Sequence, residues 1–171
     1  MYNEKAHDET WRLLAVLKIR ALYTGDSGHR RFVQVLCQLA KKTLNRIPEE
    51  FQQNFVTFSG TIVEGPKETL RMHFSNACDV IEKWSKEEAD SKESRQQVLP
   101  YAEFQKLLRI SQHFRGTIDF WPMMICVSLC QSPDYHGNGM EVLSHIFDMY
   151  YYAKEETPFE ELNKIILQAC G

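Results

Sequence analysis

The sequence has no long hydrophobic run and almost no strand pattern. Its most apolar stretch, residues 119–130, is far shorter than the roughly 20 apolar residues that span a bilayer. The first ten residues, MYNEKAHDET, are polar and do not resemble a secretory signal. No run of four or more alternating apolar and polar residues is bounded by turn residues. These absences predict a chain that does not enter a membrane and that forms few strands.

The sequence also lacks the common signatures of cofactor binding and catalysis. It has no glycine-rich phosphate loop, and its six histidines show no metal-ligand spacing. The five cysteines are an odd number without a framework pattern, which favours reduced thiols and an intracellular location, cytoplasmic or nuclear. We therefore expect a protein that is not an enzyme and that binds neither a cofactor nor a metal.

Two short patterns resemble parts of catalytic or metal sites. Gly25-Asp26-Ser27-Gly28 resembles the nucleophile motif of trypsin-like serine proteases, but it lies between two predicted helices and not in a β-barrel. Cys126 and Cys130 share a helix face and precede His136 and His145, but their spacing matches no zinc pattern. A turn and a pair of buried thiols are the better interpretations.

Helical patterns fill most of the chain. Four prolines are followed by glutamate and a large apolar side chain, which is typical of a helix start: Pro48, Pro66, Pro100 and Pro158. Apolar residues at helical spacing predict helices over residues 4–23, 30–45, 48–58, 66–84, 100–114, 119–130, 140–153 and 158–169. Between two of them, residues 61–63 could be briefly extended.

The helices predict an all-α fold with one domain over residues 1–171. We expect about seven or eight helices, arranged as an irregular helical bundle or a short helical-repeat-like stack. The proline-led starts are separated by 18, 34 and 58 residues, so they have no fixed repeat period. The charged stretch near residues 85–98 predicts an exposed loop or helix end.

The net charge of −3 is distributed unevenly. Residues 1–46 hold nine Lys/Arg against four Asp/Glu, whereas the rest of the chain is acidic. Basic residues at both ends of the second predicted helix form a candidate patch for nucleic acid or a phosphate-bearing ligand: Arg30, Arg31, Lys41, Lys42 and Arg46. Arg30 and Arg31 would oppose the helix dipole, so helix stability does not explain them.

Three consecutive tyrosines, Tyr150-Tyr151-Tyr152, precede acidic residues and the last predicted helix. Neighbours on a helix point about 100° apart, so at least one of these rings is exposed. Exposed aromatic residues beside charges are common anchors in protein interfaces, although a tyrosine can also lie along the rim of a core. We predict partner binding near Tyr150, Tyr151, Phe159, Leu162 and Trp11.

The sequence thus predicts a protein–protein interaction domain of the adaptor, scaffold or regulatory kind. Its partner would be a peptide or helix in a groove between helices. The alternative is nucleic-acid or phospho-ligand binding through the basic N-terminal helices. An enzyme with a site assembled from distant helices ranks last, because no residue pattern supports it.

Overall fold

In the part of the chain that the structure describes, the fold is helical apart from one short pair of strands. A computed structural model describes residues 3–46, 54–56, 60–64, 70–86, 96–97 and 138–170. These ranges contain the α-helices α1 (Glu4–Thr24), α2 (Asp26–Lys41), α3 (Leu70–Ser85), α6 (Asn138–Ala153) and α7 (Phe159–Cys170). They also contain one 3-10 turn, η1 (Leu44–Arg46), and the antiparallel strands β1 (Asn54–Val56) and β2 (Ile62–Glu64).

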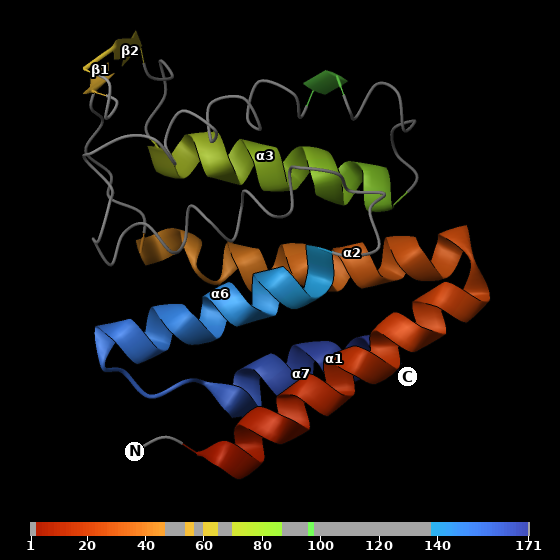
Figure 1. The fold of residues 1–171 in the computed structure, drawn as a ribbon. Helices are drawn as coiled ribbons and strands as arrows, with labels where there is room; N and C mark the ends of the chain where they lie inside the picture. Colours follow the sequence, from red (N-terminus) through yellow and green to blue (C-terminus); the bar gives the residue numbers. More distant parts are fainter. Residues whose placement is uncertain are drawn as a thin grey trace.

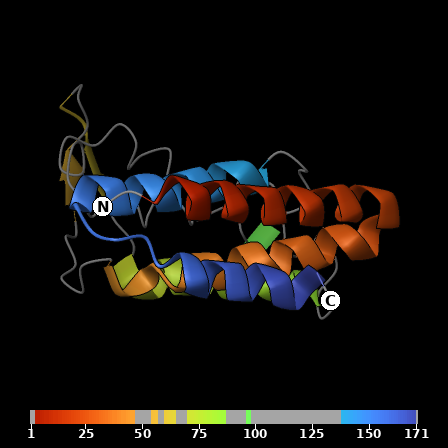
Figure 2. The same cartoon turned by 90° about the horizontal axis from the view of Figure 1, so that it is seen from below.

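The helices form two layers, with α2 in contact with four other helices. In Figures 1 and 2, α1 and α6 lie in one layer over a second layer of α7, α2 and α3. Helix α2 packs against α3 on one side, α7 on the other, and α1 and α6 across the layers. Helix α1 also packs along α7. The arrangement is an irregular bundle built around α2.

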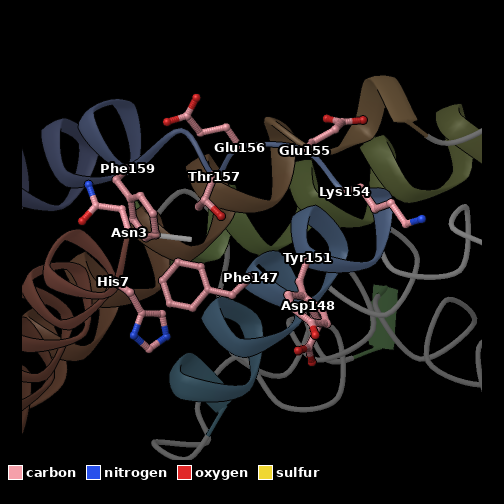
Figure 3. Close-up of a pocket in the computed structure, with 10 residues that line it drawn as sticks. All are labelled: Asn3, His7, Phe147, Asp148, Tyr151, Lys154, Glu155, Glu156, Thr157 and Phe159. Carbon is pink, nitrogen blue, oxygen red and sulfur yellow. The ribbon is translucent and has the colours of Figure 1, made fainter. Parts of the chain in front are cut away.

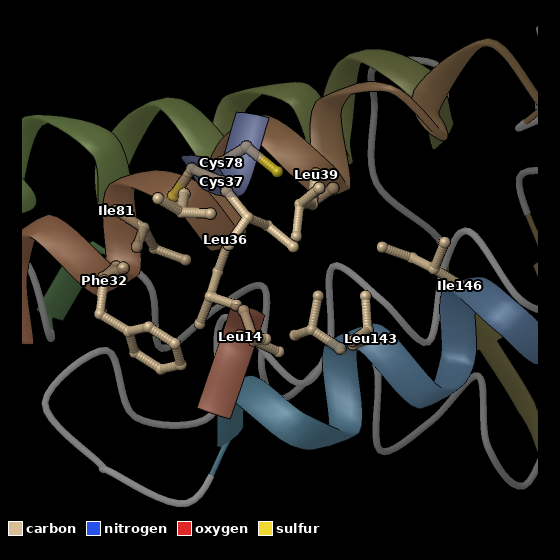
Figure 4. Packing of buried hydrophobic residues seen from close by; sticks show 14 of the residues in the cluster. Leu14, Phe32, Leu36, Cys37, Leu39, Cys78, Ile81, Leu143 and Ile146 are labelled. Carbon is tan, nitrogen blue, oxygen red and sulfur yellow. The ribbon is translucent and has the colours of Figure 1, made fainter. Parts of the chain in front are cut away.

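The core lies between the layers and is made by apolar faces at helical spacing. One cluster of almost fully buried side chains joins three helices, with Leu14 from α1, Phe32, Leu36 and Leu39 from α2, and Leu143 from α6 (Figure 4). Cys37 and Cys78 are buried, as predicted for most of the cysteines. Cys170 is half-buried. Cys126 and Cys130 lie outside the described residues.

Local chemistry explains where several helices begin. The Asn3 side chain accepts a hydrogen bond from the Ala6 amide at 3.1 Å and caps α1. Gly25 separates α1 from α2 with φ of 71°, a backbone conformation that favours glycine. Pro158 directly precedes α7, and its carbonyl accepts hydrogen bonds from the amides of Glu161 and Leu162. The proline-led start is therefore confirmed at Pro158.

One predicted helix is wrong in part, and others lie outside the described residues. The helix expected over residues 48–58 is a strand at Asn54–Val56, where Phe55 pairs with Val63. The phenylalanines have helical spacing, but this segment pairs instead with Val63 and Ile62, β-branched residues that favour strands. The briefly extended segment predicted at residues 61–63 corresponds to β2. The helices predicted over 100–114 and 119–130 are not among the described residues.

The charged stretch begins where α3 ends, at Ser85, and Lys86 is exposed in the following turn. Gln96 and Gln97 are exposed, and residues 87–95 and 98 are not described. Within the described ranges, every helix is too short or too polar to cross a lipid bilayer.

Candidate functional site

The main hollow of interest lies where the start of α1 meets the end of α6 and the linker to α7. It has a volume of about 510 Å³. Its apolar wall consists of Phe147, Tyr151 and Phe159, together with the ring of His7 (Figure 3). Polar groups of the chain start and the linker complete the lining: Asn3, Asp148, Lys154, Glu155, Glu156 and Thr157. We call this hollow the aromatic pocket.

Ring contacts from three helices hold the wall of the aromatic pocket in place. The Phe147 ring of α6 lies 4.7 Å from the His7 ring and 5.8 Å from the Trp11 ring, both of α1. It also lies 5.8 Å from the ring of Phe159, the first residue of α7. Tilted and edge-on contacts at these distances are favourable aromatic geometries. The wall is therefore preformed by the packing of α1, α6 and α7.

The linker between α6 and α7 forms the rim of the pocket. A helix-end motif and an ion pair hold it in place. Lys154 ends α6 with φ of 55°, and the Glu155 amide donates to the Tyr150 carbonyl at 3.0 Å. This is a Schellman-type helix end with lysine where glycine is usual. Arg46 of η1 binds both carboxylate oxygens of Glu155, and its guanidinium lies 4.7 Å from the centre of the Tyr150 ring.

The Arg46–Glu155 pair changes the acidity of both groups. The hydrogen bond from Arg46 lowers the pKa of Glu155 below its ordinary value of 4.5. The same hydrogen bond raises the pKa of Arg46, against the opposing effect of its partial burial. Because Glu155 is paired, the remaining charged groups that line the pocket are Asp148, Glu156 and Lys154. The rim is therefore mildly acidic.

The residues predicted for partner binding fall in different environments. Tyr151 is 69% exposed at the pocket, and Phe159 is 9% exposed in its wall. Trp11 is half-buried behind Phe147, and Tyr150 is half-buried beneath Arg46. Leu162 is 2% exposed and belongs to the core, so its side chain does not face a partner.

The predicted basic patch does not form one surface. Lys41 lies 2.8 Å from Asp79 and also binds Glu82, whereas Lys42 binds Glu161 of α7. Burial lowers the pKa of Lys41, but the hydrogen bonds and charges of Asp79 and Glu82 outweigh this effect and raise it above 10.5. Three of the five predicted basic residues, these two lysines and Arg46, therefore pair with carboxylates of other helices or of the linker.

The other two basic residues lie near the start of α2. The Arg30 guanidinium lies 4.5 Å from the centre of the Trp84 ring and donates to the Trp84 carbonyl. Arg31 is exposed. The structure therefore separates these arginines from the cations at the far end of α2.

Two rings in the lining of the aromatic pocket, those of His7 and Phe147, were not predicted from the sequence. Each lies four residues from a predicted residue on the same helix face, His7 from Trp11 on α1 and Phe147 from Tyr151 on α6. That spacing could have been used to find them. The contact between the two helix faces could not have been predicted, because nothing in either segment specifies that α1 packs beside α6.

Among the residues that the structure describes, no three His, Cys, Asp or Glu side chains converge in a way that could hold a metal ion. His145 is described, whereas Cys126, Cys130 and His136 are not. The chain matches no protein family, and neither a characterised protein nor a solved structure is detectably similar to it.

Proposed function

We propose that the chain is a non-enzymatic protein–protein interaction domain that binds a peptide or helix of a partner in the aromatic pocket. The observation that supports this is that one hollow is lined by the exposed ring of Tyr151, the half-buried ring of Phe147 and the buried ring of Phe159. A role as an intracellular adaptor, scaffold or regulatory domain is part of the same proposal.

The size and lining of the pocket suit the side chains of a polypeptide. A hollow of about 510 Å³ is within the usual range of binding pockets, which are mostly apolar with a few polar groups. Aromatic walls supply a large contact area at little cost in side-chain entropy, and tyrosine adds a hydroxyl that can bind a partner backbone. An apolar side chain of the partner would therefore pack against Phe147 and Phe159, with Tyr151 at its edge.

The charges of the rim indicate which partner residues the pocket favours. Asp148 and Glu156 outnumber Lys154 once Glu155 is paired with Arg46. Complementary charge across an interface favours the correct partner and disfavours acidic ones. We therefore expect a segment with a large apolar residue close to a lysine or arginine.

A peptide-display selection on the immobilised full chain tests this proposal. The expected result is enrichment of peptides that combine a large apolar residue with a basic one. Tyr151→Ala should weaken the selected peptides by about tenfold, in the range of an aromatic interface residue. Tyr23→Ala is the matched control, because Tyr23 is 87% exposed on α1 and does not line the aromatic pocket.

Two results would count against the proposal. One is a selection that enriches no sequence pattern. The other is a set of peptides whose affinity falls equally with Tyr151→Ala and Tyr23→Ala, or with neither. Circular dichroism of each variant separates loss of binding from loss of folding, and the exposure of both tyrosines makes unfolding an unexpected outcome.

A further inference from the structure

Helix α1 carries a second apolar stripe on the side that faces away from the bundle. Val16, Ile19 and Tyr23 are 44%, 51% and 87% exposed. Together with the exposed Arg12 they are spaced by four, three and four residues, so the four side chains share one helix face, which we call the outer stripe. The same spacing, shifted by two residues or about 200° around the helix, gives the buried face of α1: Thr10, Leu14, Leu17 and Ala21.

Packing within the bundle does not explain the outer stripe. Helix α1 packs against α2 and α7, and it runs along the lower edge of the bundle in Figure 1. A surface helix normally carries polar residues on the face that points to water. Single exposed apolar residues are ordinary, but three on one helix face form a continuous patch of the kind that a partner covers.

The order of residues along the outer stripe is complementary to itself when it is reversed. Arg12 lies at one end and Tyr23 at the other, about 16 Å apart along the helix axis, with Val16 and Ile19 between them. In an antiparallel pair of α1 helices, Val16 of each copy would meet Ile19 of the other, and Arg12 would meet Tyr23. A guanidinium over a tyrosine ring is an attractive contact, which the chain also makes between Arg46 and the ring of Tyr150.

We propose that two copies of the chain associate through their outer stripes, with the α1 helices antiparallel. A two-fold interface makes every contact twice, so it has two pairs of Val16 and Ile19 at its centre and a pair of Arg12 and Tyr23 at each end. Parallel helices would instead place the two Arg12 side chains opposite each other, and like charges across an interface are unfavourable. A second copy therefore matches both the apolar and the charged positions of the outer stripe.

The basic residue beside the centre of the outer stripe permits this approach. Arg20 follows Ile19 and is directed toward α7 by its hydrogen bond to the carbonyl of Cys170. In the antiparallel pair its position lies opposite Ala15 of the second copy, a small half-buried residue. None of the four outer-stripe residues lines the aromatic pocket, so this proposal does not rest on the proposed function.

Analytical ultracentrifugation of the full chain tests the proposal. A single helix pair is a small interface, so we expect the mass to rise from the 20.0 kDa of one chain toward twice that value between about 1 and about 500 μM. Ile19→Glu should raise the dissociation constant by about tenfold or more, because it brings two like charges to the centre of the interface. Met72→Glu is the matched control, since Met72 is 55% exposed and belongs to α3 in the other layer (Figure 2).

Disulfide cross-linking measures the orientation of the two helices. Arg12→Cys and Tyr23→Cys chains, mixed and oxidised, should form a bridge between the two variants at the substituted positions, whereas neither variant alone should bridge there. Bridges that form in each variant alone would show a parallel pair and overturn the proposed arrangement. The parent chain gives the background from its own five cysteines, and peptide mapping identifies the bridged residues.

A mass of one chain at every concentration would overturn the proposal. Association that Ile19→Glu and Met72→Glu change equally, or not at all, would overturn it as well, because the contact would then lie elsewhere. Circular dichroism shows whether Ile19→Glu folds, and Tyr23→Ala, at the more exposed position, is a second variant that should also weaken association. Peptide binding in the aromatic pocket should be unchanged in Tyr23→Ala, so failure of this proposal and failure of the proposed function are distinguishable.

Discussion

The indole Nε1–H of Trp11 donates a hydrogen bond to Nε2 of His7, 2.8 Å away and one turn earlier in α1. Nε2 is therefore an acceptor, which places the proton of a neutral His7 on Nδ1, 3.4 Å from the carboxylate of Asp8. Both rings pack against Phe147. A hydrogen bond within α1 thus orients the two side chains that support the wall of the aromatic pocket.

Replacement of His7 tests this arrangement. His7→Leu keeps an apolar contact with Phe147 but leaves the Trp11 indole without this acceptor, so the free energy of unfolding should fall by about 1 kcal/mol. His7→Gln keeps an acceptor in the side chain and should cost less. Urea unfolding followed by circular dichroism measures both. Equal losses in the two variants would show that the hydrogen bond contributes little.

The helix end at Lys154 offers a prediction of the opposite sign. Lys154 has φ of 55°, which costs a residue with a Cβ about 1 kcal/mol relative to glycine. Lys154→Gly should therefore raise the free energy of unfolding by up to about 1 kcal/mol. Lys164→Gly, within the exposed face of α7, should lower it by a similar amount, because glycine disfavours a helix interior. Denaturant midpoints that shift in the same direction for both variants would contradict this explanation.

Acid should weaken the fold through two carboxylates. Hydrogen bonds from Lys41 and Lys86 lower the pKa of Glu82 below 4.5, and the hydrogen bond from Arg46 lowers that of Glu155 in the same way. A carboxyl group whose pKa is lower in the folded chain than in the unfolded chain stabilises the fold at pH values above its unfolded-state pKa. That stabilisation is present at neutral pH and is lost as the pH falls through 4.5 and then through the folded-state values.

Unfolding by urea across this pH range measures the effect. Glu82→Gln should flatten the decline and lower the free energy of unfolding at neutral pH by about 1 kcal/mol, the range of a partly exposed ion pair. Glu9→Gln is the matched control, since it removes a carboxyl group from an exposed position of α1. A decline that is the same in Glu82→Gln as in the parent chain would exclude this carboxyl group as its source.

Helices were the most predictable feature of the fold. The prediction for residues 4–23 is close to α1 (Glu4–Thr24), and those for 140–153 and 158–169 are close to α6 and α7. The start of α2 was placed four residues late, at Arg30 instead of Asp26. The predicted helices leave a six-residue break over residues 24–29, but one glycine with a positive φ, Gly25, is enough to end one helix and begin the next.

The candidate sites were predictable only in their single residues. Tyr151 and Phe159 could be named because each belongs to a short local pattern of aromatic and charged residues. The partners of Lys41, Lys42 and Arg46 could not, since Glu82, Glu161 and Glu155 lie far away in the chain. A local reading counts charges on one helix, whereas neutralisation depends on which helices are neighbours in three dimensions.

The position of α2 at the centre of the bundle has a consequence for any assembly that the chain forms. A helix of 16 residues is a stiff rod roughly 24 Å long. Arg46, just beyond the C-terminal end of α2, holds the rim of the aromatic pocket through Glu155. A partner bound in that pocket would thus keep a fixed orientation relative to the whole bundle, because the rim is tied to the central helix and not to a flexible tether.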